Sequence, residues 1–106
     1  MAVELKTDND FENALADNKL VIVKYFADWC GSCRLFTPKF KRLSEDERYK
    51  DITFLDVNAE KSPEARKKAG VDNLPFFGTF KNGELIEGTA TTKEEKLVEM
   101  LDNLKN

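Results

Sequence analysis

Residues 20–34 have the sequence LVIVKYFADWCGSCR, which joins a strongly apolar run to a pair of closely spaced cysteines. The run at 20–26 is interrupted only by Lys24 and is rich in β-branched residues. Such a run is typical of a central strand that is covered on both faces, as in a parallel sheet. The stretch therefore predicts a buried strand followed directly by a two-cysteine motif at the start of the next helix.

The sequence on either side alternates between strand and helix patterns. Strands are expected at residues 3–5, 52–57, 76–80 and 84–87, and helices at about 9–17, 33–46, 63–69 and 93–104. This order predicts an α/β fold in which a central mixed β-sheet is flanked by helices on both faces. Because no linker, repeat or low-complexity segment interrupts the pattern, we expect residues 1–106 to form a single domain.

Side chains suited to capping mark the expected starts of three helices. Asp8 and Ser62 are predicted to accept hydrogen bonds from the first turns of the helices that follow them. Pro63 fits the first position of the second of these helices. Thr92 and Glu95 have the spacing of a capping box and are predicted to open the last helix.

Glycine and proline indicate further turns and bends. Gly70 is expected to end the helix before it in the left-handed conformation. Asn82 and Gly83 separate two apolar runs and predict a tight β-hairpin. Pro38 lies inside the predicted helix at 33–46 and is expected to bend it.

Composition and charge narrow the classes of function. The net charge of −3 provides no basic surface for nucleic acid or for anionic lipid. No run approaches the roughly 18–20 apolar residues that cross a membrane. Residues 1–10 are polar and acidic, unlike a signal peptide, so we expect a cytoplasmic protein.

Cys30 and Cys33 form one site, because they are the only cysteines and lie three residues apart. At the first turn of a helix, a small adjustment at this spacing opens or closes a disulfide. Free N–H groups and the positive end of the helix dipole stabilise a thiolate there. We predict that Cys30 is the attacking thiolate and Cys33 the resolving thiol, with Gly31 leaving the approach to Cys30 open.

Three other uses of the cysteine pair are less favoured. A structural disulfide across so short a loop would stabilise the fold only slightly. A zinc ion needs four ligands, and the chain has two cysteines and no histidine, so two chains would have to share one ion. The third alternative is two buried cysteines without a role. The absence of histidine also excludes Cys–His and Ser–His–Asp catalysis.

The motif and its surroundings resemble the thioredoxin family. Residues 26–34 (FADWCGSCR), followed by Pro38, resemble the active-site segment of that family, and residues 74–76 (LPF) and 80–83 (FKNG) resemble two further segments. The resemblance extends from the first predicted helix to the last. It implies the thioredoxin fold and a thiol–disulfide oxidoreductase that uses a redox-active disulfide and no cofactor.

The resemblance also implies roles for residues around the cysteines. Trp29 would cover the active site and pack beside the cysteines. Pro75 would follow a cis peptide bond, and the backbone of Leu74 would hydrogen-bond an extended substrate segment. Ser32 stands where most members of the family have proline. Its added N–H and hydroxyl are expected to favour the thiolate of Cys30 and so to weaken reducing power.

Two further sites depart from the family pattern. The family has a buried aspartate beneath the second cysteine and a lysine on the adjacent strand. This chain has Lys24 and Asp56 at those positions, so the pair is present but exchanged. We expect Lys24 to face the interior and to pair with Asp56, either structurally or in proton transfer, with an outward-reaching Lys24 as the alternative. A glycine of the peptide groove would fall near Gly88 or Thr89.

Three functions follow from these expectations. The leading one is a monomeric, cytoplasmic protein that reduces disulfide-containing protein substrates and is re-reduced by an electron donor of the thioredoxin-reductase type. The second is a thiol oxidase or isomerase in an oxidising compartment, which Ser32 favours. The third is a binding or redox-sensing module. None of the three involves nucleic acid or a membrane.

Overall fold

The apolar run at residues 20–26 forms the middle strand of a five-stranded sheet in the computed structural model, which describes residues 3–106. The strands are β1 (Val3–Lys6), β2 (Leu20–Phe26), β3 (Thr53–Asn58), β4 (Phe76–Lys81) and β5 (Glu84–Ala90). Their order in the sheet is β1-β3-β2-β4-β5. β2 pairs in parallel with β3 and antiparallel with β4, so the predicted mixed sheet and central strand are confirmed.

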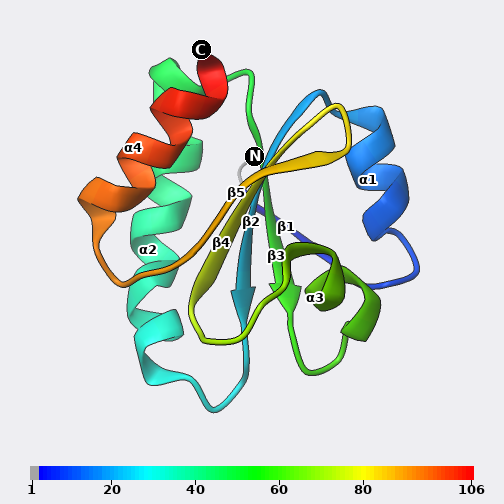
Figure 1. The fold of residues 1–106 in the computed structure, drawn as a ribbon. Coiled ribbons are helices and arrows are strands. Elements are labelled where there is room, and N and C mark those ends of the chain that lie inside the picture. Colours follow the sequence, from blue (N-terminus) through cyan, green and yellow to red (C-terminus); the bar gives the residue numbers. More distant parts are fainter. Residues whose placement is uncertain (1–2) are drawn as a thin grey trace.

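Helices cover both faces of this sheet, as predicted (Figure 1). They are α1 (Phe11–Asp17), α2 (Gly31–Ser44), α3 (Pro63–Ala69) and α4 (Glu94–Lys105), with a short 3-10 helix, η1 (Glu47–Tyr49). Figure 1 shows α2 and α4 on one side of the sheet and α1 and α3 on the other. Successive side chains of β2 point to opposite faces, so Val23 and Tyr25 join the core under α1 and α3, whereas Ile22 joins the core under α2 and α4. Lys24 therefore faces the side of the sheet that α2 covers.

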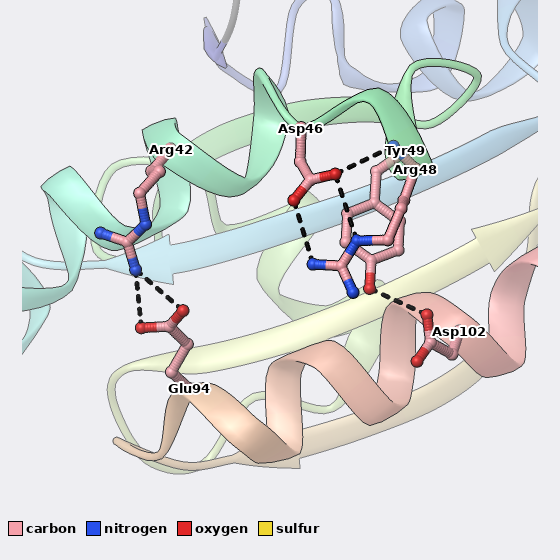
Figure 2. Close-up of polar contacts among 6 residues, drawn as sticks. All are labelled: Arg42, Asp46, Arg48, Tyr49, Glu94 and Asp102. Carbon is pink, nitrogen blue, oxygen red and sulfur yellow. Dashed lines mark hydrogen bonds and ion pairs between the residues drawn. The ribbon is translucent and has the colours of Figure 1, made fainter.

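Polar contacts anchor the C-terminal half of α2 and η1 to α4 (Figure 2). The Nη2 of Arg42 donates hydrogen bonds to both carboxylate oxygens of Glu94, at 2.8 and 2.9 Å. The buried Tyr49 hydroxyl donates to Oδ1 of Asp102 at 2.8 Å. Burial of the phenol, followed by this hydrogen bond, raises the pKa of Tyr49 to about 12. These contacts fix the C-terminal end of α2 and the adjoining η1 against α4. The opposite end of α2 carries the cysteines.

The ends of α2 differ from the prediction. The helix begins at Gly31 rather than at Cys33, because the N–H of Cys33 bonds to the sulfur of Cys30, which occupies the N-cap position. It ends at Ser44, before the expected Asp46. Asp46 instead accepts a backbone hydrogen bond at the start of η1, an element that the sequence did not predict.

Two of the predicted caps are wrong: Asp8 is not at the cap position of α1, and Ser62 occupies that of α3 without making the cap hydrogen bond. Asp8 does not cap α1, because Asp10 is the residue at the cap position of this helix. The Asp8 carboxylate instead accepts hydrogen bonds from the backbone of α3, from Glu64 at 3.1 Å and from Ala65 at 2.9 Å. Ser62 precedes α3, but its buried hydroxyl has no hydrogen-bond partner within residues 3–106. Asp8 thus supplies the cap that the sequence assigned to Ser62.

The last predicted cap also fails, whereas the turn predictions hold. Lys93, not Thr92, precedes α4, and no side chain caps that helix. Gly70 ends α3 in the left-handed conformation, with φ of 65°. Asn82 and Gly83 have φ of 52° and 84°, which is the backbone that a tight hairpin between β4 and β5 requires.

Replacement of Asp8 tests the cap on α3. Asp8→Ala removes the acceptor for two backbone N–H groups, so we expect it to lower the free energy of unfolding by about 1 kcal/mol. Ser62→Ala is the matched control and should cost nothing, because the Ser62 hydroxyl makes no hydrogen bond within the described part of the chain. Urea unfolding measures both, and an equal loss in Ser62→Ala would restore Ser62 as the cap.

Candidate active site

Cys30 and Cys33 form a disulfide between the end of β2 and the start of α2. Their Cα atoms are 5.3 Å apart. Both residues are nearly buried, 4% and 3% exposed, so exposure does not distinguish them. Hydrogen bonding does: the sulfur of Cys30 accepts the N–H of Cys33 at 3.1 Å, at the positive end of the α2 dipole. When the disulfide is reduced, this position stabilises a thiolate on Cys30.

Gly31 has open space around it, and Ser32 adds a polar contact to the sulfur of Cys30. A Cβ at Gly31 would have no neighbour within 4 Å, so the space around this residue is open. The hydroxyl oxygen of Ser32 lies 3.6 Å from the sulfur of Cys30. Proline at this position would provide neither the hydroxyl nor a backbone N–H.

The loop before β4 lies against the disulfide. The Leu74–Pro75 peptide bond is cis, as the resemblance implied. Leu74 packs against the small apolar cluster formed by Ala27, Cys30 and Cys33. Residues separated by about forty positions in the sequence are therefore brought together at the carboxyl end of β2.

A shallow cavity of about 230 Å³ lies beside this loop. It is lined by residues 73–75 and 90–92. The N–H of Thr91 donates to the carbonyl oxygen of Pro75 at 3.3 Å, which joins the two walls. The second wall is formed by Ala90 to Thr92, which directly follow Gly88 and Thr89 in the sequence. Gly88 has a packing role instead, because a Cβ there would approach the ring of Phe76 to 2.9 Å.

Trp29 directly precedes Cys30 and is the largest exposed side chain of the active-site loop. Its side chain is 68% exposed. The indole Nε1 donates a hydrogen bond to Oε2 of Glu60 at 2.7 Å. This partner, which the sequence did not suggest, holds the indole on the surface, so Trp29 presents an exposed aromatic surface beside the active-site loop.

Lys24 and Asp56 are neighbours on β2 and β3, and the structure confirms that Lys24 faces the interior. Their Nζ and Oδ1 atoms are 3.5 Å apart, with the side chains 2% and 24% exposed. The Nζ of Lys24 also donates to the hydroxyl of Thr37 at 3.1 Å. An outward-reaching Lys24 is thereby excluded.

Burial shifts the pKa values of both members of this pair toward their neutral forms. Burial raises the pKa of Asp56, and the nearby Lys24 ammonium offsets only part of that shift. Burial likewise lowers the pKa of Lys24, with partial compensation by Asp56. The Oδ1 of Asp56 accepts no hydrogen bond from residues 3–106. Both side chains line a cavity of about 220 Å³ together with Cys30 and Cys33, so the ion pair and the disulfide share one cavity.

Two other kinds of site are not found in the described part of the chain. Residues 3–106 contain no group of three or more cysteine or carboxylate side chains placed to hold a metal ion. No helix within these residues is long and apolar enough to cross a membrane.

Comparison with known proteins places the chain in a family. The Thioredoxin family model matches residues 2–103. Thioredoxin-1 of Schizosaccharomyces pombe is 36% identical over 97 residues, which cover 92% of this chain and 92% of that protein. Thioredoxin of Homo sapiens is 31% identical over 106 residues, 98% of this chain and 99% of that protein.

A solved structure agrees with these sequence matches. The reduced thioredoxin pre-protein of Schistosoma mansoni superposes with a TM-score of 0.85 at 38% identity, over 96% of this chain and 96% of that chain. The sheet order and helix placement are therefore those of the thioredoxin fold. Since the matches span nearly the whole chain, including the segment with the Cys30–Cys33 disulfide, the chain belongs to the thioredoxin family and is a dithiol–disulfide oxidoreductase.

Proposed function

We propose that the protein reduces protein disulfides, with Cys30 as the attacking thiolate and Cys33 as the resolving thiol. The hydrogen bond from the N–H of Cys33 to the sulfur of Cys30 supports this assignment, because it places the sulfur of Cys30, and not that of Cys33, at the positive end of the α2 dipole. The Cys30 thiolate attacks a substrate disulfide and releases one substrate thiolate. Cys33 then attacks Cys30 and releases the second. Two electrons pass from the dithiol to the substrate, and the Cys30–Cys33 disulfide forms.

Residues around the disulfide are proposed to bind the substrate. The cavity beside Leu74 and Pro75 lies next to the cysteine cluster and offers backbone groups to an extended segment. The exposed ring of Trp29 supplies an apolar surface on the same loop as Cys30. Gly31, which has no side chain and open space around it, is proposed to ease the approach of a substrate to Cys30.

The Lys24–Asp56 pair is proposed to serve the resolving step. Asp56 accepts the Cys33 proton across the cavity that both side chains line, and the Lys24 ammonium stabilises the thiolate that forms. Burial raises the pKa of Asp56, which makes its carboxylate a stronger base toward the Cys33 thiol. The exchanged pair thus takes over the task of the buried carboxylate that the family carries on β2.

Asp56→Asn tests this role. We expect release of the mixed disulfide to slow by about 10²-fold, the usual contribution of a general base, while its formation stays unchanged because Cys30 needs no base. Stopped-flow measurement with a doubly labelled peptide disulfide separates the two steps. In the unmodified protein, release should slow as the pH falls through the raised pKa of Asp56, since the protonated carboxyl cannot accept a proton. Unchanged release in Asp56→Asn would leave the pair with a structural role alone.

The proposed cellular setting is that of a cytoplasmic protein-disulfide reductase, the first of the three functions expected from the sequence. We propose a single-domain monomer in the cytoplasm that uses its disulfide without a cofactor. Its substrates are disulfide-containing proteins, and its electrons come from a donor of the thioredoxin-reductase type. Turbidity produced by insulin reduction in the presence of dithiothreitol tests the central claim. No acceleration over dithiothreitol alone would favour the binding or redox-sensing module.

Ser32 favours a second candidate, a thiol oxidase or isomerase. Its hydroxyl lies near the sulfur of Cys30, where a donor stabilises the thiolate and hence the reduced form. A more stable reduced form makes the couple a stronger oxidant. The reduction potential, measured against a glutathione buffer, decides between a reductant and an oxidant.

Ser32→Pro should make the couple more reducing, because it removes both the hydroxyl and the backbone N–H beside the Cys30 thiolate. We expect a fall in potential of about 30 mV, which corresponds to about 1.4 kcal/mol for this two-electron couple. Ser32→Ala removes the hydroxyl alone and should give part of the shift. A rise in potential in Ser32→Pro would refute the proposed effect of Ser32.

A further inference from the structure

Thr37 connects the buried Lys24 to the backbone of the resolving cysteine. It lies on α2, four residues after Cys33. Its hydroxyl accepts a hydrogen bond from Nζ of Lys24 at 3.1 Å and donates one to the carbonyl oxygen of Cys33 at 3.3 Å. No motif in the sequence pointed to Thr37, because its importance depends on Lys24, which reaches it from another element.

The contacts of the Lys24 ammonium make Thr37 its nearest polar partner. A buried ammonium carries three donors and is costly unless acceptors surround it. Thr37 lies 3.1 Å from Nζ, whereas the carboxylate of Asp56 lies 3.5 Å away. The ring of Phe40 lies beneath the ammonium, with its centroid 5.4 Å from Nζ. The hydroxyl of Thr37 therefore determines where the positive charge sits relative to Asp56.

Lys24, Thr37 and Asp56 line two cavities. The first, of about 220 Å³, also contains both cysteines in its wall. The second, of about 390 Å³, lies toward β1 and the middle of α2 and is lined in addition by Val3 and Phe40. The three side chains thus lie between the cavity beside the disulfide and the second cavity. The position of the Lys24 ammonium therefore decides which of the two cavities its positive charge faces.

We propose that Thr37 is a positioning residue that holds the Lys24 ammonium toward Cys33, where the positive charge stabilises the Cys33 thiolate. This proposal rests on the proposed function, in which Cys33 resolves the mixed disulfide. In that step the thiol proton of Cys33 moves to the carboxylate of Asp56. The Cys33 thiolate then attacks the sulfur of Cys30, the bond from Cys30 to the substrate breaks, and the substrate leaves as a thiolate.

Thr37 can be replaced without disturbing the core, because its side chain belongs to an exposed position of α2. Thr37→Val keeps the β-branched shape and removes the hydroxyl, and Thr37→Ser keeps the hydroxyl. The remaining charged residues around the two cavities are exposed and are the same in every variant, so they contribute equally to each titration: Asp28, Arg34, Lys41 and Glu45.

The test measures the ionisation of Cys33 in the full chain carrying Cys30→Ala, from the rate of alkylation by iodoacetamide as a function of pH. Thr37→Val should raise the midpoint by about one pH unit, a tenfold loss of thiolate, because the ammonium loses its nearest acceptor. Thr37→Ser should leave the midpoint in place. A purely structural role for Thr37 would lower stability without moving this midpoint.

A second background shows whether Thr37 acts through Lys24. With Lys24→Met and Asp56→Leu in place, no ammonium remains to be positioned, so Thr37→Val should no longer shift the midpoint. An unmoved midpoint in the first background, or an equal shift in both, would overturn the proposal. Insulin reduction by the unmodified protein is measured in parallel: its absence counts against the proposed function, whereas the midpoints decide the role of Thr37.

Discussion

Cys33→Ser should accumulate a covalent adduct with a disulfide substrate, whereas Cys30→Ser should form none. In Cys33→Ser the Cys30 sulfur keeps its place at the start of α2 and can still attack, but no thiol remains to resolve the mixed disulfide. In Cys30→Ser the remaining thiol lies inside the helix turn, where its own N–H points toward the missing sulfur. The expected contrast is nearly all or none.

Non-reducing electrophoresis and intact mass, after incubation with a peptide disulfide, measure the adduct. The Cys30→Ser/Cys33→Ser variant gives the background. Unfolding in urea shows that each single variant is folded, which matters because both cysteines are nearly buried. Equal trapping by the two single variants would contradict the division of roles between Cys30 and Cys33.

Lys24→Met should destabilise the protein, and adding Asp56→Leu should recover most of the loss. Removing one member of a buried ion pair leaves the other charge uncompensated, at a cost of about 3–5 kcal/mol. Asp56 is 24% exposed and keeps part of its hydration, so we expect Lys24→Met to fall at the lower end of that range. Asp56→Leu alone should lower the free energy of unfolding more than Lys24→Met does, because it leaves without a counter-charge a lysine whose side chain is only 2% exposed.

The pH dependence of the Lys24→Met variant gives an independent check. Burial already raises the pKa of Asp56, and loss of the ammonium raises it further. A folded-state pKa above the unfolded value means that protonation favours the folded state. The penalty should therefore be largest at neutral pH and should shrink as the pH falls through the folded-state pKa of Asp56. Urea unfolding at several pH values measures this, and a penalty that grows in acid would show that the stranded carboxylate is not its cause.

Several features of the site could be predicted from the sequence because they depend on local pattern. The run around Lys24 identified the central strand, and the spacing of Cys30 and Cys33 identified the redox pair. The partnership of Lys24 with Asp56 was also predictable, since a charge inside one apolar strand needs an opposite charge on the next. The Leu74–Pro75 segment was recognisable only through the family resemblance.

Other features depend on residues that meet only in the folded chain. Asp8 caps α3 from 56 residues away in the sequence, although its own surroundings suggested a cap for α1. Glu60 holds the indole of Trp29 on the surface, and Ala90 to Thr92 form the wall opposite Pro75. In each case the partner comes from a segment that is distant in the sequence. The packing of the elements sets the distance between the two groups, and the local sequence does not encode it.

The sequence by itself determined the mixed sheet, its central strand and the chemistry of a dithiol at a helix start, because hydrophobic periodicity and cysteine spacing act over a few residues. The tertiary structure alone decided which groups surround that dithiol. Thr37 became the partner of Lys24 because α2 crosses the face of the sheet to which Lys24 points. A hydrogen bond forms or fails within a few tenths of an ångström, and only the packing of α2 on β2 sets that separation.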